Sequence, residues 1–266
     1  MSTDQTSNNP IPIDQTVLIT GGSGNLGQKL SNHLAGRSTL RLLDKFPRHP
    51  DVIEADFAEW NFQWIDHFKG VDTVVHLAAD PNAGQDWHKL IEPNMDGLIN
   101  VFTAAAQNGV KRIVYASSNH VMGGYQSLIP PQQLAPDVPP KPGAIFSGLN
   151  GETMNSTAYG GAKLFGERIG KTYHEIYGLS TIAVRIGWVR AGENEASTMP
   201  PRDSWFRLMW LSNRDFCHLM ECCITADPEL GFAIINGMSN NTGMRWDLES
   251  ARSLVGYVPQ DDVTKP

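Results

Sequence analysis

The sequence lacks several features that would define other classes of protein. Its apolar runs fall well short of the roughly 20 residues that a membrane-spanning helix needs, and it has no run of basic residues. The net charge of −7 over 266 residues also argues against a nucleic-acid-binding surface. We therefore expect neither a membrane nor a nucleic acid as a partner.

Cysteine is scarce, with three residues at Cys217, Cys222 and Cys223. A clustered, odd number of cysteines fits neither a disulfide framework nor the ligand spacing of a zinc site. Free thiols are typical of reducing compartments, so we expect a cytoplasmic protein without a bound metal. Residues 1–15 are rich in Ser, Thr, Asn and Gln and lack the apolar segment of a signal peptide, which predicts a flexible tail.

The remaining residues, 16–266, show no internal repeat, and a hydrophobic content of 41% supports a full core. Short β-branched runs alternate with segments of helical apolar spacing, which predicts a Rossmann-type α/β fold with a doubly wound parallel sheet. The predicted strands are 16–20, 40–44, 52–56, 73–77, 112–116, 179–186 and 232–235. The predicted helices are 25–35, 60–68, 95–108, 158–177, 215–224 and 248–254.

The alternation of strands and helices weakens in the last third of the chain. We expect a single domain in which residues 16–187 form mainly the Rossmann core and 188–266 mainly a small C-terminal substrate lobe over the strand ends. Residues 126–156 contain Pro130, Pro131, Pro136, Pro139, Pro140 and Pro142. Because proline interrupts helices and strands, we expect no regular element there, and either a lid over the site or a surface excursion.

A glycine-rich turn follows the first predicted strand and opens a helix. Gly21, Gly24 and Gly27 give the tight turn and close approach that a dinucleotide pyrophosphate needs. Asp44 ends the second strand, 20 residues after Gly24, where a carboxylate binds the adenosine ribose and repels a 2′-phosphate. This pattern predicts NAD as the cofactor.

Three side chains close to Asp44 in the sequence could also contact the cofactor. Lys45 and Arg48 could pair with a 2′-phosphate, which leaves NADP open. Asp56, after the third strand, could accept a hydrogen bond from the adenine amine. A glycine-rich turn without any ligand is the alternative, and the strand, helix and Asp44 in register argue against it.

Tyr159 and Lys163 lie one helical turn apart on the same face of a predicted helix. An ammonium favours the phenolate form of a nearby tyrosine, so the pair predicts a general base with a pKa nearer neutrality than that of free tyrosine. The alternative is a surface tyrosine beside a solvated lysine.

Ser117, Ser118, Asn119 and His120 follow the fifth strand, at the edge where ligands of parallel sheets bind. A serine hydroxyl there could hydrogen-bond the reacting oxygen, and Asn119 and His120 could bind the hydroxyls of a polyol. Seen alone, the segment would equally fit a turn at the end of a strand.

These motifs together resemble a known superfamily. Thr20-Gly21-Gly22-x-Gly24-x-x-Gly27, His76-Leu77-Ala78-Ala79, Asn94, Ser118 and Tyr159-x-x-x-Lys163 are similar to the extended short-chain dehydrogenases/reductases. Segments 115–123, 184–187, 210–212 and 256–261 resemble those of uronate dehydrogenases and related sugar dehydrogenases, which oxidise the anomeric carbon of a sugar to a lactone with NAD.

The resemblance implies roles for individual residues. Tyr159 takes the proton of the anomeric hydroxyl, Lys163 stabilises the tyrosinate and binds the nicotinamide ribose, and Ser118 hydrogen-bonds the reacting oxygen. Asn94 positions Lys163 through water, and Asn119 and His120 contact sugar hydroxyls. The expected cofactor-binding residues are Gly21, Gly24, Asn25, Leu26, Gly27, Asp44, Asp56, Phe57, Leu77, Ala78, Ala79, Tyr159 and Lys163.

Two positions depart from the pattern of uronate dehydrogenases. Trp188 stands where those enzymes have a serine, and Trp205 stands where they have an arginine that holds the substrate carboxylate. Both tryptophans and Arg207 are candidate substrate-binding residues, and Arg190 and Arg202 flank the segment. A sulfonate or phosphate at C6, or a neutral aldose, would suit this arrangement, and core packing is the alternative for both tryptophans.

The leading hypothesis is an NAD-dependent dehydrogenase that oxidises C1 of a hexose or acidic sugar to the aldonolactone. A sugar epimerase or dehydratase on the same fold, and a non-catalytic module that senses NAD, are the alternatives. The intact Tyr159 and Lys163 pair argues against the sensing module. A small-molecule sugar is the expected partner, and relatives imply a homo-oligomer.

Overall fold

The computed structural model describes residues 12–128, 133–148, 151–199 and 204–265. A parallel seven-stranded sheet forms its centre, in the order β3-β2-β1-β4-β5-β8-β9. The strands are β1 (Thr16–Thr20), β2 (Thr39–Asp44), β3 (Val52–Glu54), β4 (Thr73–His76), β5 (Arg112–Ser118), β8 (Ser180–Ile186) and β9 (Phe232–Gly237). The order reverses between β1 and β4, which is where open parallel sheets bind their ligands.

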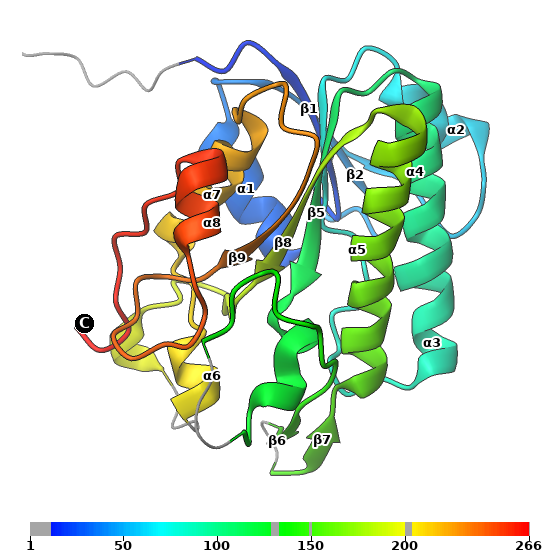
Figure 1. Ribbon diagram of the computed structural model, residues 1–266. Coiled ribbons are helices and arrows are strands. Elements are labelled where there is room, and N and C mark those ends of the chain that lie inside the picture. Colours follow the sequence, from blue (N-terminus) through cyan, green and yellow to red (C-terminus); the bar gives the residue numbers. More distant parts are fainter. Residues whose placement is uncertain (1–11, 129–132, 149–150, 200–203, 266) are drawn as a thin grey trace, which may run out of the picture.

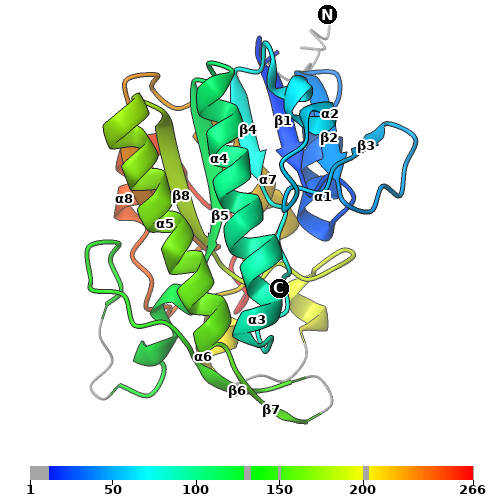
Figure 2. The same ribbon diagram turned by 90° about the vertical axis from the view of Figure 1, so that its right-hand side faces the viewer.

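Helices cover both faces of the sheet, as Figures 1 and 2 show. One face carries α1 (Asn25–Leu34), α7 (Asn213–Ile224) and α8 (Glu249–Val255), and the other carries α2 (Phe62–Ile65), α4 (Gly97–Gln107) and α5 (Thr157–Tyr177). Successive residues of a strand face opposite sides. Accordingly, Val17 and Ile19 of β1 pack with the first group of helices, and Leu18 packs with the second. The predicted doubly wound Rossmann-type fold is confirmed.

A separate apolar cluster lies beyond the ends of β5 and β8 and forms the small lobe. It combines a 3-10 helix, Asn119–Tyr125, with α6 (Ser204–Leu208), and its core members include Met122, Met209 and Trp246. Three elements after residue 187 belong to the main layers, because β9 completes the sheet and α7 and α8 pack on it, and the division of the chain at residue 187 stays a prediction. The lobe therefore draws on both halves of the chain.

The segment 126–156 contains a β-hairpin, so the expectation of no regular element was wrong. Strand β6 (Ile145–Ser147) pairs with β7 (Thr153–Asn155) in antiparallel register. The prolines explain the error, because the hairpin begins only after Pro142. Pro130 and Pro131 lie outside the described residues. The short helices α3 (Trp87–Ile91) and α6 were not predicted either.

Ile13 and Gln15, which the sequence analysis placed in a flexible tail, are held by contacts with the fold. Ile13 is buried against the core, and its backbone N–H donates to the carbonyl of Arg37 at 2.8 Å. Gln15 accepts a hydrogen bond from the Thr73 hydroxyl at 2.9 Å. Residues 1–11 lie outside the described part of the chain. Within the described part, no helix has the length and apolar character that crossing a membrane would require.

Candidate active site

A cavity of about 820 Å³ opens at the carboxyl ends of the strands. Its wall comes mainly from the segments that follow β1, β2, β3, β4, β5 and β8, which the parallel sheet brings to one edge. All thirteen residues expected to bind the cofactor contribute to this wall: Gly21, Gly24, Asn25, Leu26, Gly27, Asp44, Asp56, Phe57, Leu77, Ala78, Ala79, Tyr159 and Lys163.

The glycines allow the chain to turn tightly and pack closely at the start of α1. Gly21 has φ of +73°, and a Cβ there would lie only 2.9 Å from the backbone nitrogen of Ala78. Gly24 directly precedes the helix. A Cβ atom at Gly24 would have the carbonyl oxygen of Gly21 as its nearest neighbour. The first N–H groups of a helix have no intrahelical acceptor, so this end of α1 fits a dinucleotide pyrophosphate.

The Asp44 carboxylate is fixed at the end of β2 by two backbone donors. Ser23 N–H donates to Oδ2 at 3.0 Å, and Phe46 N–H donates to Oδ1 at 2.9 Å. Lys45 is paired with Asp56, with 2.5 Å between Nζ and Oδ2, and this bond raises the pKa of Lys45. The ammonium group of Lys45, which is the positive charge nearest to Asp44 in the sequence, is therefore already paired with a carboxylate. The contact expected between Asp56 and adenine stays a prediction.

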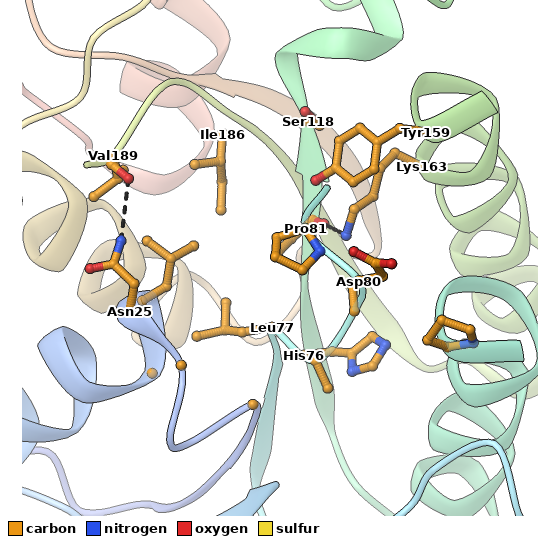
Figure 3. A pocket seen from close by; sticks show the side chains of 18 of the residues that line it. Asn25, His76, Leu77, Asp80, Pro81, Ser118, Tyr159, Lys163, Ile186 and Val189 are labelled. Atoms are coloured by element: carbon orange, nitrogen blue, oxygen red, sulfur yellow. Dashed lines mark hydrogen bonds between the residues drawn. The ribbon is translucent and has the colours of Figure 1, made fainter. Parts of the chain in front are cut away.

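Ser118, Tyr159 and Lys163 converge from β5 and α5 on one side of the cavity, as Figure 3 shows. The Lys163 ammonium lies 5.7 Å from the centre of the Tyr159 ring. Burial raises the pKa of Tyr159 to about 12; a hydrogen bond with Ser118 lowers it, and the charge of Asp80 raises it. The expectation that Lys163 brings this pKa toward neutrality is wrong for the protein chain alone, because the cost of burying a phenolate is larger.

Lys163 is itself held inside the protein. Its Nζ donates to the carbonyl of Ala116 at 2.9 Å, and burial lowers the pKa of the amine to about 8. The side chain thus combines a fixed position with a charge that is only partly retained above pH 8. Both properties come from its place on the buried face of α5.

Asn94 and Asp80 form a contact that the sequence did not predict. Asn94 lies in a π-helical turn, Glu92–Asp96, and its amide bonds both backbone groups of Asp80, accepting at 2.7 Å and donating at 3.1 Å. Asn94 therefore fixes the segment after β4, and its expected water-mediated contact with Lys163 stays a prediction. Asp80 lines the cavity. Its position directly after His76-Leu77-Ala78-Ala79 was the signal available in the sequence.

Asn119 and His120 line the cavity beyond Tyr159, as expected of groups that bind a polyol. The amide nitrogen of Asn119 donates to the carbonyl of Ile186 at 3.0 Å, while its Oδ1 is buried without a partner among the described residues. His120 Nδ1 lies 2.7 Å from Ser156 Oγ, and burial lowers the pKa of His120 to about 4. At neutral pH its ring is uncharged.

The end of the cavity away from the glycine turn is lined by more apolar side chains than the sequence predicted. Trp188 lines it as expected, together with Phe146, Phe206 and Met209, which the sequence analysis missed. Phe146 lies in the segment that was read as a loop, so its sequence context carried no signal. The three aromatic rings and the thioether make this end of the cavity apolar.

Two expected substrate-binding residues lie outside the cavity wall. Trp205 is buried in the small lobe, 4.5 Å from the ring of Trp246, so the core-packing alternative holds for it. Arg207 is exposed, and its guanidinium donates to the carbonyl of Val263 at 3.4 Å. Phe206 lies between Trp205 and Arg207 on α6. Of these three residues, Phe206 is the one that lines the cavity. Arg202 lies outside the described residues.

The glycine turn, the Asp44 carboxylate and the buried Tyr159 and Lys163 pair define a Rossmann-fold protein that binds a nicotinamide dinucleotide. Comparison with known sequences gives the family. The sequence model of the NAD dependent epimerase/dehydratase family matches residues 17–201. The chain belongs to this family, and its cofactor is NAD.

Characterised relatives match nearly the whole chain. An NAD-dependent glucose-6-phosphate dehydrogenase from Haloferax volcanii is 35% identical over 94% of this chain and 95% of its own length. An L-arabinose 1-dehydrogenase (NAD(P)(+)) from the same organism is 30% identical, over 92% and 96%. The crystal structure of a mutant uronate dehydrogenase from Agrobacterium tumefaciens, complexed with NAD, has a TM-score of 0.76 at 30% identity and covers 95% of this chain and 87% of its own.

Proposed function

We propose that the protein is an NAD-dependent sugar dehydrogenase that oxidises the C1 hydroxyl of a sugar to the aldonolactone. The observation that carries this proposal is the position of Ser118 and Tyr159, which lie in one cavity with the dinucleotide-binding turn and with Asn119 and His120. The relatives named above are dehydrogenases of glucose 6-phosphate, L-arabinose and uronate, which supports a sugar as the substrate.

Each polar residue has a role in this reaction. The phenolate of Tyr159 accepts the proton of the C1 hydroxyl, Ser118 orients that hydroxyl, and Lys163 supplies positive charge beside the phenolate. The glycine turn and Asp44 would hold NAD, which would supply a hydride acceptor and the positive charge of its nicotinamide ring. Because burial alone raises the pKa of Tyr159 to about 12, the phenol needs both of these charges to act as a base.

The substrate class is a hexose or an acidic sugar, either a uronate or a sugar with a sulfonate or phosphate at C6. Asn119 supports a polyhydroxylated substrate, because this polar residue belongs to the cavity wall together with Ser118 and Tyr159. The neutral ring of His120 can bind a second hydroxyl.

A panel of sugars with NAD tests this function, with NADH formation followed by absorbance. The panel comprises glucuronate, galacturonate, glucose, glucose 6-phosphate, 6-sulfo-glucose and L-arabinose. We expect NADH from at least one sugar together with its lactone. Conversion of a sugar without net NADH would instead identify an epimerase or dehydratase, and no conversion of any sugar would contradict the proposal.

A further inference from the structure

Two phenylalanines from distant parts of the chain meet at the apolar end of the cavity. Phe146 belongs to β6 and Phe206 to α6, and their ring centres lie 5.0 Å apart at an interplanar angle of 54°. Both rings line the cavity. A tilted pair of this kind offers a continuous aromatic surface to anything bound beside it.

The hairpin directs Phe146 inward. Successive side chains of a strand point to opposite sides, and the preceding residue, Ile145, is 67% exposed whereas Phe146 is half-buried. Across the hairpin, Phe146 pairs with Met154, whose methyl group occupies the space that a Cβ at Gly84 would need. The hairpin thus packs on the loop that follows β4.

The base of the hairpin is tied to the polar part of the site. Ser156 Oγ accepts a hydrogen bond from the backbone N–H of Ala144 at 2.8 Å, and it also lies 2.7 Å from His120 Nδ1. The N–H of Ser156 donates to the Ala144 carbonyl at 3.0 Å. One hydroxyl therefore couples the position of the hairpin to the orientation of the His120 ring.

His120 lies between the two phenylalanines and the expected base. Its ring centre is 5.6 Å from that of Phe146, 6.1 Å from that of Phe206 and 5.7 Å from that of Tyr159. A molecule whose reacting hydroxyl contacts Tyr159 would therefore have its body beside His120 and the two phenylalanine rings.

We propose that Phe146 and Phe206 form an aromatic platform for the apolar face of the sugar ring, which makes Phe146 a specificity-determining residue contributed by the hairpin. The inference rests on the proposed function. A pyranose gathers C–H bonds on its faces, and these carry slight positive charge that the negative face of an aromatic ring attracts. Stacking on the platform selects sugars whose C–H bonds lie on one face.

Variants at Phe146 test the platform. Phe146→Ala is expected to raise the KM for the best sugar of the panel by about tenfold or more, the size of one lost aromatic contact with its buried area. Phe146→Tyr keeps the ring and is expected to keep the KM near that of the wild type. Ile145→Ala is the matched control, because that side chain is 67% exposed on the other side of the same strand. The KM for NAD should stay unchanged in all three, which also verifies that they fold.

Binding without turnover separates this inference from the proposed function. Glucose 6-phosphate, L-arabinose and glucuronate are titrated by calorimetry into Tyr159→Phe and into Tyr159→Phe/Phe146→Ala, both with NAD present. Weaker sugar binding by the double variant supports the platform. Equal binding by the two variants would overturn the platform alone. Binding of none of the six sugars of the panel to either variant, measured in the same way, would overturn the proposed function and the platform together.

Discussion

Burial controls the chemistry of the two residues that the proposed reaction needs most. It raises the pKa of Tyr159 to about 12 and lowers that of Lys163 to about 8, so each shift favours the uncharged form. The spacing of the two residues was visible in the sequence, but the size of the burial effect was not. A base at this position therefore depends on positive charge brought next to it.

Replacing Tyr159 by phenylalanine removes the proposed base with little change in volume. We expect turnover to fall by about 100-fold to 10,000-fold, the range of general-base catalysis, with the dissociation constant of NAD essentially unchanged. Steady-state rates and NAD titration by fluorescence measure the two quantities. Retention of wild-type turnover would exclude Tyr159 as the base.

The pH dependence of turnover follows from the direction of the Tyr159 shift. Because its pKa is raised, the phenolate is the minor form at neutral pH, and its fraction grows as the pH rises. We expect kcat to increase from pH 7 toward pH 8, before Lys163 loses its charge, and Lys163→Gln to move this rise to higher pH. A kcat that falls over the same interval would contradict the assignment of a phenolate base.

Asp44 is proposed to select NAD over NADP. Its carboxylate is held by Ser23 and Phe46 where a 2′-phosphate would meet a negative charge. Asp44→Ala is expected to reduce the preference for NAD by about tenfold or more, the size of a lost charge-assisted hydrogen bond. The ratio of kcat/KM with the two cofactors measures it. Glu54→Ala, an exposed change in β3, is the control, and an equal effect there would refute the selection by Asp44.

At the scale of elements, the sequence predicted those strands and helices that have a recognisable local pattern of apolar residues. All seven strands of the sheet were recognised, because buried parallel strands are continuous β-branched runs. The hairpin β6–β7 was missed, since three-residue strands with one inward side chain each have no usable periodicity. The same limit applies to α6. There, Trp205 and Phe206 are neighbours in the sequence, and only tertiary packing decides which of them faces the cavity.

One ion pair joins two helices on the same face of the sheet. Glu221 of α7 binds Arg37, which follows α1, with 2.5 Å between Oε1 and the guanidinium, and His33 of α1 at 2.6 Å. The Arg37 bond lowers the pKa of Glu221 to about 2, against an ordinary value of 4.5. A carboxyl with a lowered pKa stabilises the fold above its unfolded-state value and loses this contribution as the pH falls toward the folded-state value.

Glu221→Gln is therefore expected to lower the free energy of unfolding by about 1–3 kcal/mol at pH 7. Urea denaturation at pH 7 and at pH 3 measures the effect, which should shrink at pH 3 because the Glu221 carboxyl of the unfolded chain is then mostly protonated while that of the folded chain is still ionised. The exposed pair of Glu249 and Arg252 provides the control, Glu249→Gln, for which little change is expected. A loss that is equal at both pH values would contradict the role of the Glu221 charge.

At the scale of the whole molecule, the parallel sheet explains why one cavity can serve cofactor and sugar together. The carboxyl ends of six strands meet at one edge, so the glycine turn, Asp44, Ser118 and Tyr159 reach the same space from distant parts of the sequence. The small lobe then closes the sugar end with side chains from both halves of the chain. The proposed function depends on this arrangement more than on any single motif.

Transfer of a labelled hydrogen tests that account most directly. The protein is incubated with NAD and with glucose 6-phosphate, L-arabinose or glucuronate that carries deuterium at C1, and the NADH is examined by mass spectrometry. The account predicts that the sugar that is oxidised passes its deuterium to NADH. Formation of unlabelled NADH from every deuterated sugar, or conversion of the sugar with the deuterium retained at C1, would contradict oxidation at C1.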